Sequence, residues 1–391
     1  MSGSFLSRAG LHTAGFYAAF FMAMGVHLPF WPLWLGDWGL TASEIGLFAA
    51  LGMGARVVGG LVIPTLADRM DARRNTVLAC TLVCMVLFVA HLWIGERAVL
   101  LAATLVIGAA LAGISSIAEA LGVAASRYHG FPYAQARGAG SLGFLAANLT
   151  FGGLIAAWGS DVALWAIVAG LAGVLVLAPG HPGGRRVETG PPPQLGEIAR
   201  VMLHPVFALF VVTVAFGQGG HAVYYAFGTV HWRSLGIGEG TIGALWAVSV
   251  GAEIVLMVVF GATIVARLGP VGALAASSAA GVLRWGAMMF DPGLWMLWVL
   301  QASHALSFAV GHLAAVAFIA RAVPARYGAA AQGAMGQVVV SLLTALAMAL
   351  AAAAYPSFGG LSYAIAVAMS TVGLGLCLLL ARRWHGEEIA V

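Results

Sequence analysis

Long apolar runs recur along the whole chain, and they decide what it can fold into. Residues 98–118, for example, contain no charged side chain. A helix of about 20 apolar residues crosses the hydrocarbon core of a bilayer, and backbone without internal hydrogen bonds is excluded from that depth. We therefore expect the runs to be transmembrane helices.

The composition also indicates a lipid environment. Hydrophobic residues make up 61% of the 391 residues and charged residues only 8%, whereas a soluble domain is about 25% charged. A soluble fold of this length would need many more polar side chains to cover its cores. All 18 basic residues are arginine and the net charge is only +4, which does not indicate a nucleic-acid surface. We expect no nucleic-acid partner.

Twelve runs meet the length criterion, and each is predicted to be one span. Residues 179–200, which include Pro191, Pro192 and Pro193, are predicted to be a linker because proline cannot continue a helix. The fold class is thus an all-α membrane protein with twelve transmembrane helices in two six-helix halves, residues 1–178 and 201–391, with a solute site between the halves near the midplane. The expected spans are 11–35, 44–66, 76–94, 98–125, 135–157, 161–178, 204–230, 240–264, 271–290, 294–320, 329–354 and 359–381.

The arginines predict the orientation, because short cytoplasmic loops retain positive charge. One set of loops holds most of them, whereas the opposite set holds only Arg97 and Arg233. We therefore expect a multi-pass protein of the inner membrane with both termini and the linker in the cytoplasm. Residues 1–12 show no signal-peptide cleavage pattern, so the first span is expected to be retained.

Three ionisable side chains are expected at one depth in the second half. Glu253, Arg284 and His304 each lie about 10–13 residues inside neighbouring spans. Charged groups at this depth are rare unless they are paired or functional. Arg284 would stabilise ionised Glu253, and its movement would let that carboxylate take up a proton. We predict proton coupling by this trio; a structural ion pair is the alternative.

Two further charges lie in spans of the first half. Glu119 and Arg137 are expected to pair. The pair resembles the carboxylate–arginine couple that binds sugar in lactose-type carriers, which implies a site for solute or protons; a brace between two helices is the alternative. Arg56 has no obvious partner in its own helix. It would either attract an anionic solute or pair with Glu119.

Polar and aromatic side chains at helical spacing predict a solute pocket. Together with Arg56, Arg284 and Glu119, they would suit a small ring-bearing acid. Packing against other helices or against lipid is the alternative interpretation of the aromatic residues. The predicted lining is His27, Gln218, His221, Tyr224, Tyr225, Gln301, His304 and Phe308.

The loop between the second and third spans reads Pro-Thr-Leu-Ala-Asp-Arg-Met-Asp-Ala-Arg-Arg over residues 64–74. It resembles the cytoplasmic loop signature of the major facilitator superfamily, with Pro64 in place of the usual glycine. In that family the signature holds the cytoplasmic helix ends together, so the resemblance implies a gating role for Asp68, Arg69, Arg73 and Arg74. A solvated basic loop is the alternative.

A closer resemblance, to the phenylpropionate permease family, extends along most of the chain. It implies the major facilitator fold and a proton symporter of a small organic solute, either an aromatic or another small carboxylic acid. A proton-coupled sugar or nucleoside carrier, or a drug or metabolite exporter of the same fold, is the alternative. The segments that carry the resemblance are 25–31, 46–47, 118–120, 137–144, 224–225, 245–246, 252–253, 283–285 and 301–308.

The lactose-type symporters related to this family use a glutamate, an arginine and a histidine in the helices that correspond to spans 8, 9 and 10. The resemblance therefore implies that function for Glu253, Arg284 and His304. The chain departs from the pattern one turn after His304, where Ser307 and Phe308 replace a second carboxylate.

Other classes of function lack their sequence signals. No lysine occurs, so no Gly-rich, Lys-terminated nucleotide-binding loop exists. Cys80, Cys84 and Cys377 lie in apolar runs without metal or disulfide spacing. A membrane-embedded enzyme is therefore disfavoured. A sensor is disfavoured because the loops and the tail after Ala381 are short. We expect no cofactor and no metal, with solute, protons and lipid as the partners of a monomer.

Overall fold

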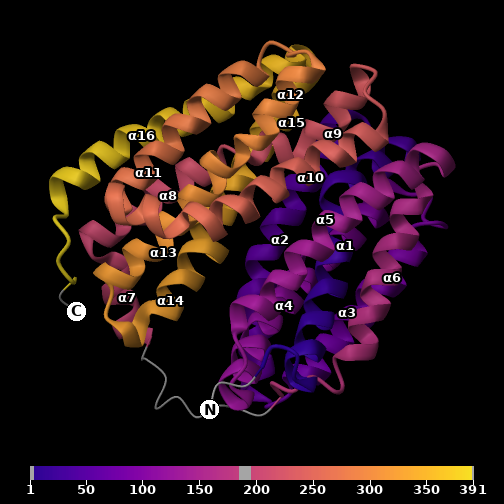
Figure 1. Ribbon diagram of the computed structural model, residues 1–391. Coiled ribbons are helices and arrows are strands. Elements are labelled where there is room, and N and C mark those ends of the chain that lie inside the picture. Colours follow the sequence, from indigo (N-terminus) through magenta and orange to yellow (C-terminus); the bar gives the residue numbers. More distant parts are fainter. Residues whose placement is uncertain (1–3, 185–194, 390–391) are drawn as a thin grey trace. The chain divides into compact units, whose positions relative to one another are not determined.

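The computed structural model describes residues 4–184 and 195–389, and these are helical apart from short connections (Figure 1). The first six helices are α1 (Arg8–Trp38), α2 (Ala42–Arg69), α3 (Arg73–Ala90), α4 (Arg97–His129), α5 (Tyr133–Trp158) and α6 (Asp161–Leu177). The later α-helices are α7 (Leu195–Leu203), α8 (Pro205–Gly219), α9 (Ala222–Ser234), α10 (Glu239–Val255), α11 (Gly261–Met288), α12 (Leu294–Ala302), α13 (Val310–Ala322), α14 (Gly328–Gly333), α15 (Ser341–Phe358) and α16 (Ala364–Arg383).

Three π-helical and two 3-10 segments interrupt the later part of the chain. A π-turn contains one extra residue and therefore disturbs the regular helical hydrogen bonds. The π segments are η1 (Leu256–Phe260), η2 (Ala305–Ala309) and η4 (Ala334–Val340), and the 3-10 segments are η3 (Ala325–Tyr327) and η5 (Gly359–Tyr363).

The chain divides into two compact units. Unit 1 consists of residues 1–41, 51–189 and 232–247, and unit 2 of residues 42–50, 190–231 and 248–391. The first turns of α2 thus belong to unit 2, and the first half of α10 belongs to unit 1.

Helix ends follow local sequence signals. At the start of α1, Ser7 Oγ accepts a hydrogen bond from the backbone N–H of Gly10 at 3.1 Å, which satisfies one free donor of the first turn. The same helix ends at Gly39, whose φ of 110° is left-handed and favours glycine. A glycine in the same conformation, Gly130, ends α4.

Close glycine contacts hold the helices of unit 1 together. α1 packs against α5 and α6. A Cβ added at Gly25 of α1 would lie 2.7 Å from the carbonyl oxygen of Phe144 in α5, and one added at Gly143 would lie 2.6 Å from that of Ala18. Such small residues let membrane helices approach closely.

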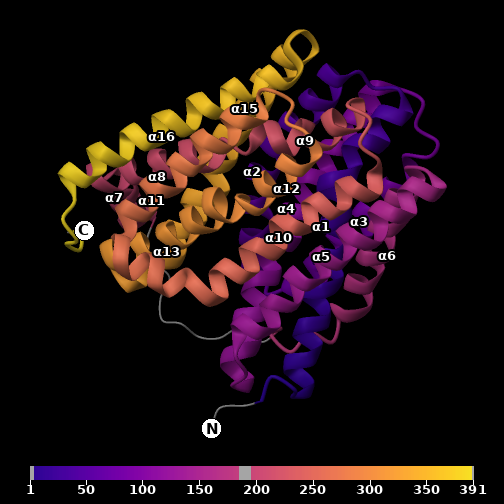
Figure 2. The same ribbon diagram turned by 45° about the horizontal axis from the view of Figure 1, so that its top comes forward.

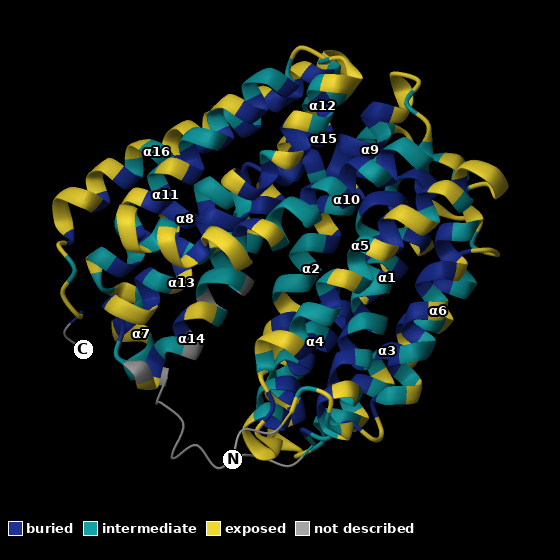
Figure 3. Ribbon diagram, viewed as in Figure 1, coloured by how far each residue is buried: buried dark blue, intermediate teal, exposed yellow. Residues whose placement is uncertain are grey.

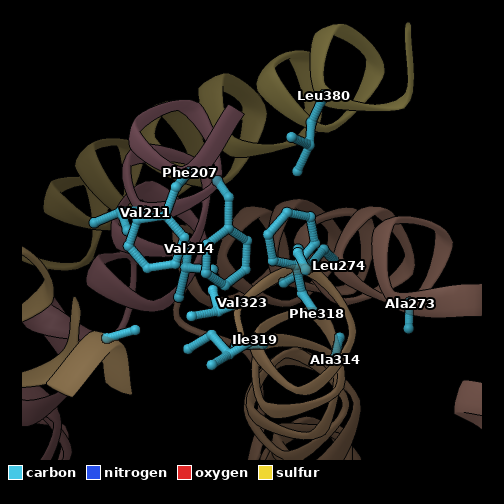
Figure 4. Packing of buried hydrophobic residues seen from close by; sticks show 14 of the residues in the cluster. Phe207, Val211, Val214, Ala273, Leu274, Ala314, Phe318, Ile319, Val323 and Leu380 are labelled. Carbon is cyan, nitrogen blue, oxygen red and sulfur yellow. The ribbon is translucent and has the colours of Figure 1, made fainter. Parts of the chain in front are cut away.

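Unit 2 has an apolar core between α8, α11, α13 and α16. α8, α11 and α16 run side by side in both views (Figures 1 and 2). Phe207 of α8 and Phe318 of α13 are completely buried there (Figure 4). Phe210 of α8 is also completely buried. The rings of Phe210 and Phe318 stack with centroids 3.9 Å apart. This core fixes the helices that carry the polar residues described below.

Many large apolar side chains are exposed, and exposed residues recur along the helices (Figure 3). Val258 and Leu283, for example, are 79% and 76% exposed. Among the described residues, nine helical stretches are long and apolar enough to cross a membrane. The two longest, Glu239–Met288 and Ala331–Arg383, contain non-helical backbone at Gly269 and Gly359. The exposed apolar surface is therefore that of a membrane protein.

Two features differ from the regular spans expected from hydropathy. The predicted span 204–230 is broken, because α8 ends at Gly219 and α9 begins at Ala222. α7 begins inside the predicted linker 179–200, since residues 194–204 contain no proline. The proline-rich residues 185–194 of that linker lie outside the described residues.

Candidate functional site

Three ionisable side chains of unit 2 form one connected polar cluster. Glu253 lies near the end of α10, Arg284 in α11, and His304 between α12 and η2. His304 Nε2 is 2.9 Å from Glu253 Oε1, and His304 Nδ1 is 2.7 Å from Arg284 Nη1. The imidazole therefore bridges the carboxylate and the guanidinium.

Protein groups occupy most of the hydrogen-bond donors of buried Arg284. Nε donates to the backbone oxygen of Leu300 at 2.9 Å, and Nη2 donates to Gln301 Oε1 at 3.2 Å. Nη1 donates to His304 Nδ1 and, at 3.4 Å, to Ser307 Oγ. Because a guanidinium has only five N–H groups, this arginine is committed to the protein interior.

The contacts of His304 assign its tautomer. Arginine nitrogens only donate, so Nδ1, which faces Arg284, must accept and carries no hydrogen. The ring hydrogen then lies on Nε2 and is donated to Glu253. While Arg284 stays in place His304 is a neutral bridge, and Glu253 is the member of the trio that can gain a proton.

Irregular backbone surrounds the cluster. η1 begins three residues after Glu253, and η2 begins directly after His304. The break between α8 and α9 lies at Gly220 and His221. π-turns and interrupted membrane helices leave backbone groups without their regular partners, and they occur where neighbouring side chains can satisfy those groups.

Two side chains from other helices support the π-turn η2. Ser277 Oγ donates to the backbone oxygen of Ser307 at 2.7 Å, and Gln218 Nε2 donates to that of Phe308 at 3.2 Å. Gly311 makes this possible, since a Cβ there would lie 2.5 Å from Gln218 Nε2 and 2.6 Å from Ser277 Oγ. Gln218, which the sequence placed in the solute pocket, thus has a structural contact.

His221 extends the polar cluster to the break in the seventh predicted span. Its Nδ1 is 2.9 Å from the backbone oxygen of Gln218, and its Nε2 is 3.3 Å from Ser307 Oγ. Its ring lies edge-on to Trp285, with centroids 5.0 Å apart. Hydrogen bonds therefore connect the broken helix to the arginine through Ser307.

The remaining predicted pocket residues of unit 2 differ in exposure. Tyr224 and Gln301 are completely buried, whereas Tyr225 and Phe308 are half-buried. The Phe308 ring stacks on the His304 imidazole with centroids 5.3 Å apart. The partly exposed side chains beside the Glu253–Arg284–His304 cluster are thus aromatic.

A second polar cluster joins α1, α4 and α5 in unit 1. Arg137 Nε is 2.7 Å from Glu119 Oε1, and the Tyr133 hydroxyl donates to Glu119 Oε2. The Tyr17 and Tyr133 hydroxyl oxygens are 3.4 Å apart. The guanidinium carbon of Arg137 lies 4.1 Å from the ring centroid of Phe21. Glu119 is therefore paired with Arg137.

His27 and Arg56 form a third polar group, also in unit 1. Arg56 makes no hydrogen bond or ion pair with any residue that the structure describes. His27 Nδ1 is buried and has no hydrogen-bond partner among the same residues. The positive charge of Arg56 opposes protonation of the His27 imidazole. The His27 ring stacks on Trp31 at 6.1 Å and meets the Phe88 ring edge-on at 5.8 Å.

Over residues 4–184 and 195–389, no group of three or more His, Cys, Asp or Glu is placed to bind a metal ion. The polar clusters thus offer proton-accepting, hydrogen-bonding and cationic groups.

Comparison with known proteins identifies the family. The model of the MFS_1 like family matches residues 11–363. The chain belongs to this family of the major facilitator superfamily. As a family member it is a multi-pass membrane transport protein and not an enzyme.

Individual relatives agree with this assignment. A protein of Escherichia coli (strain K12) described as a probable 3-phenylpropionic acid transporter is 29% identical over 355 residues, which is 89% of each chain. A variant of the nucleoside transporter NupG superposes with a TM-score of 0.79 at 13% identity, over 96% of this chain and 99% of that one. A bacterial homologue of the lysosomal transporter Spinster, inward-facing and unoccupied, gives 0.71 at 15% identity, over 95% and 96%. At these identities the two structures show the fold alone.

The loop signature of the superfamily is held by side-chain contacts. Asp68 Oδ1 lies 2.5 Å from Arg73 Nε, and Arg74 Nη2 donates to the backbone oxygen of His181. Arg69 is the exposed last residue of α2. Burial, with smaller contributions from the nearby His12 and Arg74, lowers the pKa of His181 to about 3. The signature thus anchors the segment that follows α6.

The sequence assigned no role to several residues of these polar clusters. Ser249 Oγ donates to Gln301 Oε1 at 2.5 Å, and Ser307 and Tyr133 make the contacts described above. Ser249 lies one turn before Glu253 and Ser307 one turn after His304, so helical periodicity could have found them. Ser277 gave no such signal.

Proposed function

We propose that the protein is a proton-coupled symporter of a small organic acid. The observation that carries this proposal is the continuous contact of Glu253, His304 and Arg284 in one buried cluster. We also propose that it crosses the inner membrane with twelve helices in two halves, residues 1–178 and 201–391, with both termini in the cytoplasm. In this reading Glu239–Met288 and Ala331–Arg383 each contain two spans, and the shorter α6 is one more.

Protonation of Glu253 would change how three helices are held together. In the ionised form, the carboxylate accepts a charge-assisted hydrogen bond from His304, which Arg284 orients. A protonated, neutral carboxyl group accepts a weaker bond, so α10 is released from the bridge to α11 and to His304, between α12 and η2. The adjacent π-turns η1 and η2 supply backbone that can rearrange at that level. Proton binding and helix movement are therefore coupled.

The solute class follows from two independent lines of support. The Escherichia coli relative carries the description of a probable 3-phenylpropionic acid transporter. In addition, unit 1 presents a cationic side chain, Arg56, without a protein counter-ion among the described residues. A carboxylate would compensate that charge.

Uptake into proteoliposomes tests this function. The purified protein would be reconstituted, and initial uptake of 3-phenylpropionate measured with an acidic exterior and with equal pH on both sides. Protein-free liposomes are the control, because the undissociated acid also crosses lipid unaided. We expect saturable, protein-dependent accumulation that an uncoupler abolishes. Uptake at one rate with and without the gradient would refute proton coupling, and preferential uptake of a sugar or nucleoside would refute the acid.

A further inference from the structure

Arg56 lies on the inward-facing side of α2. It is spaced four residues from Gly52 and three from Gly59, which places all three on one helix face. That face packs on α4: a Cβ at Gly108 would lie 2.7 Å from the backbone oxygen of Gly52, and one at Gly59 would overlap the backbone of Ala109. The guanidinium is therefore turned toward the helix bundle, in the middle of a span, where an uncompensated charge is costly.

The other intramembrane arginines already have protein partners. Arg284 donates to three side chains and one backbone oxygen, and Arg137 pairs with Glu119. Glu119, the alternative partner of Arg56 considered from the sequence, is occupied by Arg137 and Tyr133. Arg56 contrasts with both arginines, since no described residue bonds to it.

His27 offers a second polar atom near Arg56. Its Nδ1 is buried without a partner, and its ring is held by Trp31 and Phe88, both buried. A neutral imidazole can carry its hydrogen on either nitrogen, so an anion near Nδ1 would select the tautomer that donates to it. The two side chains, which interact electrostatically, together provide a guanidinium fork and one ring N–H.

We propose that Arg56 and His27 bind the carboxylate of the transported solute, and that the solute is a monocarboxylate. This inference rests on the proposed function and adds the binding residues and the charge of the solute. A planar guanidinium pairs with a single carboxylate through two parallel hydrogen bonds. Within unit 1, the other intramembrane arginine, Arg137, already pairs with Glu119, so a second carboxylate on the solute would lack a cationic partner there and dicarboxylates are rejected.

Binding to the intact protein in lipid nanodiscs tests the site. The ligands are 3-phenylpropionate, its uncharged amide and phenylsuccinate as a dicarboxylate. Arg56→Gln should weaken binding of 3-phenylpropionate by about ten- to a hundredfold, and His27→Phe by about two- to tenfold. The matched control is Arg267→Gln, which removes an exposed arginine of α11 and should bind like the wild type. The wild type should bind the amide and phenylsuccinate more weakly than 3-phenylpropionate.

Thermal unfolding separates ligand binding from a structural role. Because Arg56 is uncompensated in the free protein, Arg56→Gln should unfold at the same or a higher temperature than the wild type. It should also lose the stabilisation that 3-phenylpropionate gives the wild type. An Arg56→Gln variant that fails to fold, or that binds the acid within twofold of the wild type, overturns the proposed site.

The outcome for this site is distinguishable from that for symport. If Arg56→Gln binds normally while the wild type still accumulates 3-phenylpropionate with a pH gradient, the carboxylate site is refuted and symport stands. If Arg56→Gln loses binding while the wild type binds 3-phenylpropionate but shows no gradient-driven accumulation, the carboxylate site stands and symport is refuted.

Discussion

Gly311 of α13 allows two side chains to support the π-turn that follows His304, and substituting it tests whether this support matters. In Gly311→Ala, the new Cβ would lie 2.5 Å from Gln218 Nε2 and 2.6 Å from Ser277 Oγ. Both polar atoms would have to move. Each would then lose its hydrogen bond to a backbone oxygen of η2, at Phe308 and Ser307.

The cost can be estimated from these two bonds. A lost hydrogen bond costs about 1 kcal/mol net, and up to about 3 kcal/mol when a buried group is left unsatisfied. Two such losses lower the free energy of unfolding by about 2–6 kcal/mol. The better helix propensity of alanine returns about 1 kcal/mol, so we expect a net loss of about 1–5 kcal/mol for Gly311→Ala.

Gly286→Ala in α11 is the matched control. A Cβ at Gly286 meets no atom within 4 Å, so this variant should gain up to about 1 kcal/mol from helix propensity alone. The measurement is equilibrium unfolding in a sodium dodecyl sulfate titration, followed by circular dichroism. If Gly311→Ala is as stable as Gly286→Ala, the side-chain support of η2 does not contribute to stability and this reasoning is wrong.

Two further predictions concern the ends of the two units. Burial lowers the pKa of His181 in the folded protein to about 3, whereas an unfolded histidine has a pKa of about 6.5. The protein should therefore lose stability as pH falls from about 6.5 toward 3, by up to about 1.4 kcal/mol per pH unit. His181→Asn should flatten that pH dependence of unfolding, and an unchanged slope would exclude this histidine as its source. In unit 2, the ring centroids of buried Trp384 and Phe318 are 4.3 Å apart, and Trp384 Nε1 donates to the backbone oxygen of Glu387. Trp384→Ala should therefore lower the free energy of unfolding by about 3 kcal/mol in the same assay. Exposed Trp158→Ala should cost far less, and equal losses in the two variants would contradict the docking of the C-terminal segment.

The helical fold and the family were predictable from sequence because apolar runs and short motifs can be recognised without knowing any contact between side chains. Apolar runs long enough to cross a bilayer predicted helices, and nine described stretches meet that criterion. The family resemblance is confirmed by the match over residues 11–363. Hydropathy could not predict the break at Gly220 and His221 or the π-turns, since these change backbone register without changing the apolar character of the segment.

The sequence predicted which residues form the polar clusters, but it did not predict which atoms contact one another. Counting residues at a fixed rise placed Glu253, Arg284 and His304 at one depth, and the structure joins them through hydrogen bonds. Which group His304 faces with each ring nitrogen depends on side-chain geometry, which sequence does not contain. The same holds for Gln218 and Gln301, whose amides bond within the protein.

The central claim is that Glu253 carries the transported proton, and solute-driven proton flux tests it most directly. Proteoliposomes in a weakly buffered medium, at a pH where 3-phenylpropionate is almost fully ionised, would receive the solute while the external pH and solute uptake are recorded. After subtraction of the signal from protein-free liposomes, the wild type should raise the external pH in proportion to uptake. Glu253→Gln should exchange internal for external solute without moving protons. Proton uptake by Glu253→Gln at the wild-type ratio to solute would contradict the account.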